Sequence, residues 1–134
     1  MRNFTFYNPV CVHFGKGQIS ALAKEIPAPF KVLMTYGGGS IKKNGVYDQV
    51  LKALKDHTIV EFPGIEPNPT YETCMKAVEV VRKEDVDFIL SVGGGSVLDG
   101  SKFIAAAARH QGKDPWDIVL GKESVQDAVP LGCV

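Results

Sequence analysis

The amino-acid sequence predicts an α/β fold with a doubly wound, mostly parallel sheet. Short, continuously apolar segments are typical of strands buried on both faces, and here they alternate with segments of helical periodicity. The chain has 134 residues, which suits one domain. We therefore expect residues 1–134 to form a single domain whose parallel strands are joined by right-handed helical crossovers.

The first thirty residues are expected at the edge of this domain. Residues 3–10 and 11–14 are rich in aromatic and β-branched side chains, and Pro9 lies between them. They are predicted to be two short extended segments that form a β-hairpin, ended by a glycine-rich turn at 15–17. A short helix is expected over 20–26, because two prolines follow it at 27 and 29.

A regular alternation follows from residue 31. The apolar runs predict strands at 31–36, 58–62 and 87–92, with a further strand opening at 128–134. Helical periodicity predicts helices over 41–57, over 70–83 with Thr70 as the N-cap and Thr73 as a weaker candidate, and from 96 through 108, with a short helical turn at 114–117. Each of the three connections between these strands is therefore expected to contain a helix.

The composition narrows the functional classes. Fifteen basic residues balance fifteen acidic ones, and 45% of the residues are hydrophobic, so neither disorder nor a nucleic-acid partner is expected. No apolar run approaches the roughly 20 residues that span a bilayer, and the first residues lack a signal-peptide core. The three cysteines lie far apart and form no C-x-x-C pair, which indicates reduced thiols and a cytoplasmic location. The histidines are also scattered, so no metal site is expected.

One unit occurs twice in the chain. The strands at 32–36 and 88–92 each continue into Gly-Gly-Gly-Ser and then into a helix. Backbone N–H groups at such a turn, together with the positive end of the helix dipole, favour phosphate. A single triplet could be a tight turn with no ligand, whereas two matched triplets at strand ends favour a dinucleotide. Neither is G-x-G-x-x-G, and no G-K-[ST] follows, which disfavours a P-loop ATPase.

Charged residues near these turns indicate which nucleotide could bind. Asp99 is one turn into the second helix, where it could accept hydrogen bonds from ligand hydroxyls or simply be stabilised by the helix dipole. Lys102 could contact a ligand or form a salt bridge. The first strand ends without a carboxylate that would grip a ribose 2′-OH, and Lys42 and Lys43 follow it. If this is the adenosine end, NADP is favoured over NAD; the alternative is that the two lysines form a solvated helix face.

These segments resemble a known family. Residues 35–43 and 91–100, with Glu-Pro-Asn-Pro-Thr at 66–70 and Asp-Pro-Trp-Asp at 114–117, resemble the iron-containing (group III) alcohol dehydrogenases over essentially the whole chain. They are most similar to the NADPH-dependent butanol dehydrogenase and aldehyde reductase branch. The resemblance implies a Rossmann-like nucleotide-binding domain and a homodimer that pairs through residues 4–14. The cofactor-binding residues that it implies are Gly37, Gly38, Gly39 and Ser40 at the adenosine ribose and 2′-phosphate, Asn68 near the adenosine half, and Gly94, Gly95, Ser96 and Asp99 at the pyrophosphate and nicotinamide ribose.

The resemblance also implies an activity. Family members transfer hydride between NADP(H) and a primary alcohol or aldehyde, with a divalent metal, iron or zinc, that polarises the carbonyl. Its ligands, an Asp and three His, belong to a C-terminal helical domain that these residues do not include. We therefore assign no catalytic or metal-binding residue and expect no catalysis by this stretch alone. The alternatives are a non-catalytic dinucleotide-binding or interaction module and, less favoured by the Tyr36-Gly37 turn, a member of the dehydroquinate or glycerol dehydrogenase superfamily.

Overall fold

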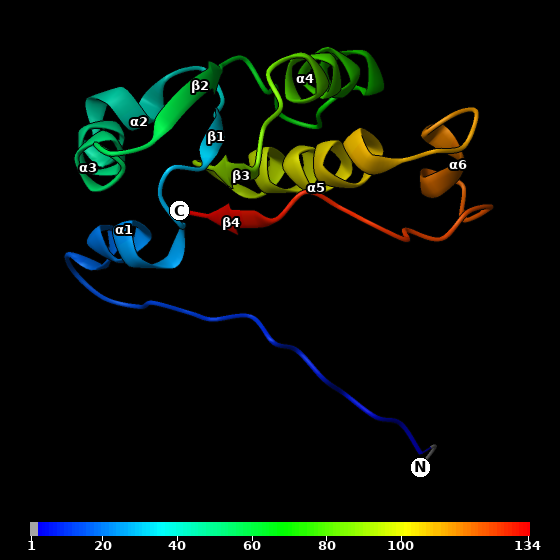
Figure 1. The fold of residues 1–134 in the computed structure, drawn as a ribbon, viewed down its shortest axis with the longest axis horizontal. Helices are drawn as coiled ribbons and strands as arrows, with labels where there is room; N and C mark the ends of the chain where they lie inside the picture. The colour runs from blue at the N-terminus through cyan, green and yellow to red at the C-terminus, as the bar shows by residue number, and fades with distance from the viewer. Residues whose placement is uncertain (1–2) are drawn as a thin grey trace.

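The computed structural model describes residues 3–134 and has a parallel sheet at its centre (Figure 1). The strand order is β2-β1-β3-β4, and all three neighbouring pairs are parallel. The strands are β1 (Lys31–Thr35), β2 (Thr58–Phe62), β3 (Phe88–Ser91) and β4 (Leu131–Cys133). Chain connections leave β1 toward one edge and β3 toward the other, so the order reverses between these two strands. The predicted α/β, doubly wound class is confirmed.

Helices cover both faces of the sheet. α1 and α3 pack on one face, and α4 and α5 pack together on the other. The helical elements are η1 (Gln18–Ala21), α1 (Leu22–Glu25), α2 (Ser40–Lys43), α3 (Val46–Ala53), α4 (Tyr71–Lys83), α5 (Gly95–Arg109) and α6 (Trp116–Val119). The predicted N-cap is confirmed, since the Thr70 hydroxyl accepts a hydrogen bond from the Thr73 N–H at 3.3 Å.

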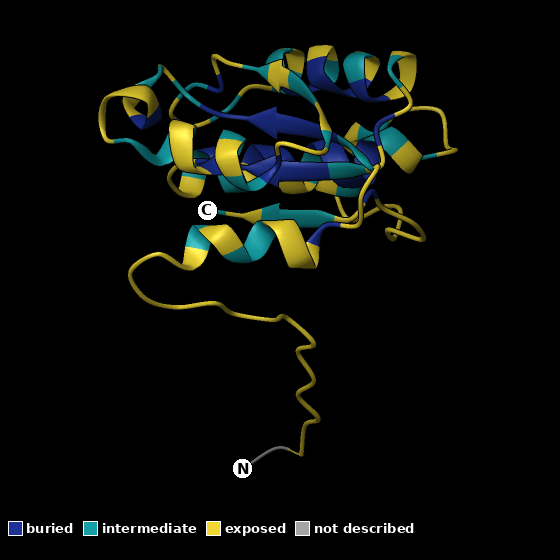
Figure 2. Cartoon of the chain, turned by 60° about the vertical axis from the view of Figure 1, so that its left-hand side comes forward, coloured by how far each residue is buried: buried dark blue, intermediate teal, exposed yellow. Residues whose placement is uncertain are grey.

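The strands are buried from both sides, which explains their continuous apolar sequences. In β1, the Leu33 side chain packs toward α4 and α5, whereas Val32 and Met34 pack toward α1 and α3. All three side chains are fully buried. Figure 2 shows the same arrangement, with the buried strands enclosed by helices whose outer surfaces are exposed. Two apolar layers therefore hold the sheet in place.

One predicted helix is divided in the structure. Residues 41–57 were expected to form a continuous helix, but α2 ends at Lys43 and α3 begins at Val46. Between them, the Asn44 side chain accepts a hydrogen bond from the Val46 N–H at 3.1 Å, and Gly45 has a left-handed φ of 79°. A side chain that takes over a backbone donor, followed by a left-handed glycine, interrupts the helical hydrogen-bond pattern.

The expected N-terminal β-hairpin does not form in the structure. Residues 3–14, which we call the arm, run away from the body of the domain without strand pairing (Figures 1 and 2). Its aromatic side chains are exposed, including Phe4 at 82% and Phe14 at 94%. An isolated two-stranded hairpin buries too little surface to be stable, and Pro9 removes one donor. The arm has β-type composition but no partner strand within the described chain.

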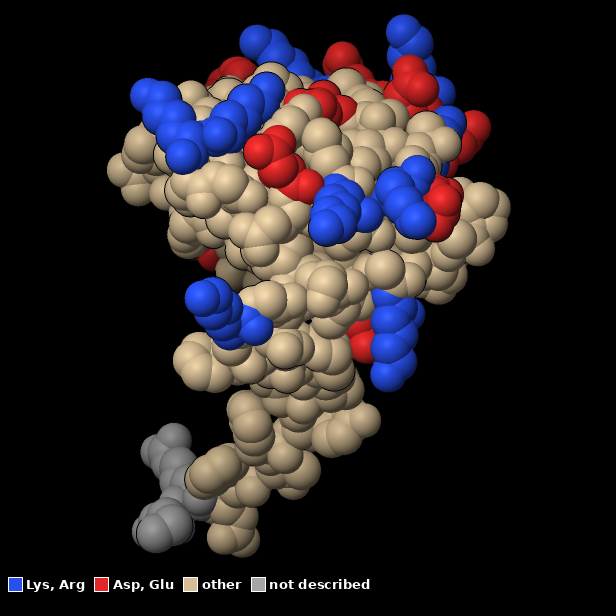
Figure 3. Space-filling view, turned by 90° about the vertical axis from the view of Figure 1, so that its left-hand side faces the viewer, with Lys and Arg blue, Asp and Glu red and all other residues tan. Residues whose placement is uncertain are grey.

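The surface carries mixed charge. Figure 3 shows basic and acidic side chains interspersed on the face that it displays, with no continuous field of one sign. The arm contains no Lys, Arg, Asp or Glu. Among the described residues, no helix combines the length and apolar character needed to cross a bilayer.

Candidate nucleotide-binding site

The two Gly-Gly-Gly-Ser turns lie side by side in the structure. One follows β1 and the other follows β3, and these strands are hydrogen-bonded neighbours in which Thr35 pairs with Ser91. A Cβ placed on Gly37 would lie 3.9 Å from a methyl carbon of Val97 in α5, so the two turns are in close contact. They occupy the point where strand order reverses, which is where doubly wound sheets bind their ligands.

A buried hydroxyl pair fixes the start of α5 against β1. The Thr35 and Ser101 hydroxyl oxygens are 2.7 Å apart, and the Ser101 hydroxyl donates to the Val97 carbonyl at 2.7 Å. Both side chains are fully buried. Because buried hydroxyls lose water and need protein partners, this pair favours one position of the helix over others.

The first turn borders a shallow depression. The Tyr36 and Gly37 carbonyls accept hydrogen bonds from the Ile65 and Gly64 N–H groups at 3.1 and 3.2 Å. This contact places the loop after β2 beside the turn after β1. The resulting depression, of about 400 Å³, is lined by Tyr36, Gly37, Gly38, Gly39, Lys42, Pro63 and Gly64. Ser40 is exposed at the start of α2.

Asn68 contacts the second turn. The Asn68 N–H donates to the Ser96 hydroxyl oxygen at 3.3 Å, so the loop before α4 lies against the first turn of α5. Asn68 has a left-handed φ of 54°, a conformation that asparagine tolerates better than most residues. Asp99 is 73% exposed, with one carboxylate oxygen 3.9 Å from the Lys102 ammonium. The structure therefore brings together Asn68, Ser96 and the predicted glycines, and it leaves Asp99 free to meet a ligand.

The glycines fall into two groups. Packing or backbone conformation requires three of them. A Cβ on Gly37 would lie 3.3 Å from the Ile65 carbonyl oxygen, Gly39 has a φ of 97°, and Gly93 combines a φ of 154° with a Cβ position 2.9 Å from Val97.

Neither condition holds at Gly38, Gly94 and Gly95. A Cβ at any of them would meet no atom within 4 Å, and none has a positive φ. The fold therefore tolerates a side chain at these three positions. A side chain added at any of these positions would extend into the open space in front of the turns.

The loop carrying Asn68 is braced by a carboxylate. One Glu66 oxygen accepts hydrogen bonds from the Thr70 N–H at 3.1 Å, the Thr70 hydroxyl at 2.8 Å and the Thr73 hydroxyl at 2.9 Å. The backbone N–H of Glu66 and these donors lower the pKa of Glu66 to about 2. The loop also packs closely against α5, since a Cβ on Gly100 would lie 3.3 Å from the Pro69 side chain.

A second carboxylate near the depression was not predicted. The Glu61 oxygens accept hydrogen bonds from the hydroxyls of Tyr36 and Tyr47, each at 2.6 Å. Burial of Tyr36, its hydrogen bond to Glu61 and the Glu61 charge raise the pKa of Tyr36 to about 12. Partial burial opposes ionisation of Glu61, but the two hydroxyls and the Lys42 charge outweigh it and lower the pKa of Glu61.

Lys42 completes this cluster. Its ammonium lies 4.7 Å from the Tyr47 ring centre and 5.4 Å from the Tyr36 ring centre, within the range of cation–π attraction. The Glu61 cluster, formed by Glu61, Tyr36, Tyr47 and Lys42, depends on a strand, a turn and two helices. No local sequence pattern could have shown that these four residues meet.

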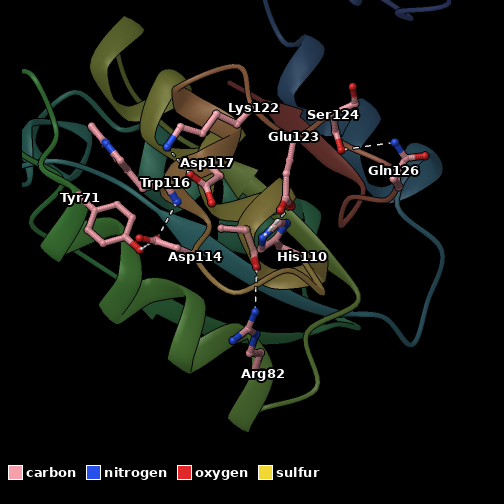
Figure 4. Close-up of polar contacts among 11 residues, drawn as sticks. Tyr71, Arg82, His110, Asp114, Trp116, Asp117, Lys122, Glu123, Ser124 and Gln126 are labelled. Atoms are coloured by element: carbon pink, nitrogen blue, oxygen red, sulfur yellow. Dashed lines mark hydrogen bonds and ion pairs between the residues drawn. The ribbon is translucent and has the colours of Figure 1, made fainter.

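A second recess lies at the far end of α5. It measures about 310 Å³ and lies between the end of α5 and the segment before β4. Figure 4 shows the contacts there: His110 lies 3.3 Å from Glu123, and Asp114 accepts from the Tyr71 hydroxyl at 2.9 Å. α5 has 15 residues and a length of about 22 Å, so this recess is remote from the glycine turns.

Similarity to known proteins identifies the family and the fold. A family profile described as "Iron-containing alcohol dehydrogenase" matches residues 9–134. The chain belongs to the iron-containing alcohol dehydrogenase family. It is 56% identical over 136 residues to the NADPH-dependent aldehyde reductase YqhD of Escherichia coli K12, covering 100% of this chain and 35% of that protein. It is 50% identical to the probable NADH-dependent butanol dehydrogenase 2 of Bacillus subtilis, again covering 100% of this chain and 35% of the relative.

Solved structures show the same fold. The substrate- and cofactor-free form of the E. coli aldehyde reductase YqhD superposes with a TM-score of 0.93 at 55% identity, covering 98% of this chain and 35% of that chain. The chain thus spans about a third of the length of the curated relatives it matches, corresponding to their N-terminal part. The resemblance drawn from the glycine turns is confirmed at the level of family and fold.

The histidines of this chain do not supply an iron site beside the glycine turns. His57 lies 2.9 Å from the Ile26 carbonyl oxygen, before β2, and His110 lies beside Glu123 at the end of α5. His13 lies on the arm beside Glu25 of α1. Because the three imidazoles are held at three separate places, the described residues do not fit a shared iron centre, and we assign no catalytic step to this chain.

Proposed function

We propose that this chain forms the nucleotide-binding domain of an NADP-dependent alcohol dehydrogenase or aldehyde reductase. One observation carries the proposal: Gly38, Gly94 and Gly95 face open space at two neighbouring strand ends, although the fold itself does not need glycine there. A ligand that approaches the backbone closely accounts for glycine at such positions. A dinucleotide accounts for two such turns, because its phosphate-bearing parts can reach both.

We propose a role for each part of the second turn. The N–H groups at the start of α5 lie at the positive end of a 15-residue helix, where they would hold the pyrophosphate. Ser96, already positioned by Asn68, adds a hydroxyl to this phosphate site. Asp99 is exposed one turn further on and would accept hydrogen bonds from the nicotinamide ribose.

The first turn would receive the adenosine ribose. Gly38 and Gly39 line the depression after β1, with Ser40 exposed beside them and Lys42 at its margin. A ribose 2′-phosphate there would meet backbone donors, a hydroxyl and positive charge, which favours NADP(H) over NAD(H). The names of the relatives do not decide this choice, since the relative at 56% identity is named an NADPH-dependent enzyme and the Bacillus subtilis relative at 50% identity an NADH-dependent one.

The complete reaction needs groups beyond these residues. We propose that the whole enzyme transfers hydride between NADP(H) and a small primary alcohol or aldehyde, and that a divalent metal, iron or zinc, supplies carbonyl polarisation. The residues present bind and orient the nucleotide and offer no ligand set for that metal at the glycine turns. We therefore expect the 134-residue chain alone to bind the cofactor without catalysis. The alternative function is a dinucleotide-binding or interaction module without chemistry.

The arm is the proposed dimer contact. It is extended, uncharged and aromatic, with Phe6 79% and Tyr7 84% exposed, so it offers an unpaired edge to a second copy of the chain. Pairing of two arms would satisfy backbone groups and cover these rings. A cytoplasmic location stays a prediction, in keeping with three free cysteines in the structure.

Calorimetric titration with NADPH and NADH tests the proposed function. We expect NADPH to bind at least tenfold more tightly than NADH, which corresponds to about 1.4 kcal/mol. Lys42→Gln and Lys43→Gln should reduce this ratio, whereas Lys113→Gln, an exposed lysine after α5, should leave it unchanged. Equal affinities would refute the NADP preference. No binding of either nucleotide to a chain with native circular dichroism would refute the nucleotide-binding domain.

A further inference from the structure

The base of the arm lies beside the end of α1, where three ligand-type side chains converge. Cys11 and His13 alternate along the extended arm and therefore project to the same side of it. Glu25 is the last residue of α1. The Cys11 sulfur lies 3.5 Å from the His13 Nε2, and the same nitrogen lies 3.1 Å from a Glu25 carboxylate oxygen. All three ligand atoms lie within 4.8 Å of one another.

These separations are close to those of ligands on one tetrahedral zinc ion. With zinc–sulfur and zinc–nitrogen bonds of about 2.3 and about 2.0 Å, sulfur and nitrogen ligands lie about 3.5 Å apart. Nitrogen and carboxylate oxygen ligands lie about 3.3 Å apart by the same reasoning. The observed 3.5 and 3.1 Å match both values. A simple ion pair between His13 and Glu25 would not require the Cys11 sulfur to meet the same nitrogen.

The donor set and its surroundings also suit a divalent cation. A thiolate and a carboxylate balance the charge of Zn²⁺, and an imidazole nitrogen is a common third ligand. All three residues are exposed, so an ion can enter and a fourth position stays open to water. Within residues 3–134 no other group of three such side chains converges in this way.

The site lies at the end of the sheet opposite the glycine turns. Glu25 is followed by Ile26, whose carbonyl lies 2.9 Å from the His57 Nε2, and His57 immediately precedes β2. The cluster is thus near the amino ends of the strands, whereas the glycine turns follow their carboxyl ends. Zinc binding here and nucleotide binding there can be measured independently.

We propose that Cys11, His13 and Glu25 bind one Zn²⁺ ion, which fastens the base of the arm to α1. On binding, the Cys11 thiol releases its proton to solvent and His13 coordinates through Nε2. Val12 and Phe14 alternate with the ligands and project to the other side of the arm. The ion would therefore order the arm's attachment and leave the aromatic residues near its tip free.

Titration of the reduced 134-residue chain with Zn²⁺ alone, followed by calorimetry, tests this site. We expect one ion per chain, and at least tenfold weaker binding in Cys11→Ser and in Glu25→Gln. Cys133→Ser removes the other exposed thiol and should leave binding unchanged. Absence of zinc binding in a folded chain, or equal loss in Cys11→Ser and Cys133→Ser, would overturn the proposal. Zinc that binds only by joining two chains would also overturn it.

Limited trypsin digestion gives a second readout. Lys16 lies between His13 and Glu25 in sequence, within the loop that the ion would close, whereas Lys122 is exposed in a loop after α6. Zinc should slow cleavage after Lys16 at least threefold relative to chelator and leave cleavage after Lys122 unchanged. Equal cleavage after Lys16 with and without zinc would contradict the proposed attachment. NADPH affinity should be the same in Cys11→Ser, so failure of this site would not be confused with failure of the nucleotide site.

Discussion

Replacing Gly95 with alanine separates the role of the glycine turn in folding from its role in binding. Gly95 is the first residue of α5, it has no positive φ, and an added Cβ would meet nothing within 4 Å. Alanine restricts the unfolded chain and favours helix, so Gly95→Ala should leave the free energy of unfolding unchanged or raise it by up to about 1 kcal/mol. Urea unfolding followed by circular dichroism measures this change.

The same substitution should weaken cofactor binding. If the open space before α5 is where the pyrophosphate lies, the added methyl group displaces it from the backbone N–H groups. A hydrogen bond to a charged group contributes about 1.5–3 kcal/mol, so losing one should raise the Kd for NADPH by about 10- to 100-fold. Calorimetric titration measures this Kd. A protein that is as stable as the wild type but binds NADPH poorly is the expected result.

Gly93→Ala is the matched contrast in the same turn. Here the backbone has a φ of 154° and the new Cβ would lie 2.9 Å from Val97, so alanine is strained at this position. We expect a loss of about 1–3 kcal/mol in unfolding free energy. If Gly95→Ala binds NADPH as tightly as the wild type, the reasoning that links the open glycine positions to phosphate is refuted.

Three further changes test other parts of the structure. Tyr36→Phe should lower the unfolding free energy by about 1 kcal/mol in urea titrations and, by freeing Glu61, reduce the preference for NADPH in calorimetry; an unchanged preference would contradict the role given to this hydrogen bond. The folded-state pKa of Glu66 is about 2 against an ordinary 4.5, so its contribution to stability is complete above pH 4.5 and is lost as the pH falls toward 2; Glu66→Gln should flatten that part of the stability curve. Phe6→Asp should shift any dimer seen by analytical ultracentrifugation toward monomer, and a dimer of unchanged affinity would exclude the arm as its contact.

The elements that sequence predicted best are those whose environment is uniform. Residues 31–35 and 58–62 are strands because apolar side chains are buried on both faces, and a continuous apolar run signals this directly. The division between α2 and α3 was missed because it depends on one hydrogen bond from the Asn44 side chain and on the left-handed Gly45. The arm was misread because aromatic and β-branched composition predicts an extended chain but says nothing about a partner strand.

The site was predictable where its residues are adjacent in sequence. The glycine turns could be located because strand, turn and helix follow one another, and Asn68 was placed by the family resemblance. The meeting of Cys11, His13 and Glu25 could not be predicted from helical spacing, because these residues combine a strand spacing with a contact across 12 residues. Such arrangements depend on the path of the chain, which local patterns do not specify.

The Glu61 cluster bears directly on cofactor choice. A carboxylate near the end of the second strand is the feature by which many dinucleotide-binding sheets hold the ribose 2′-OH of NAD, and Glu61 is the penultimate residue of β2. Taken from sequence alone, it would argue against a 2′-phosphate. In the structure, each of its oxygens accepts a hydrogen bond at 2.6 Å from a tyrosine hydroxyl, and the Lys42 ammonium lies over the same two rings. The carboxylate is thus engaged by its neighbours and partly balanced by Lys42, so the depression after β1 presents donors and positive charge where we propose that the adenosine ribose binds. The proposed preference for NADP(H) therefore follows from how Glu61 is held, as well as from the lysines beside the first turn.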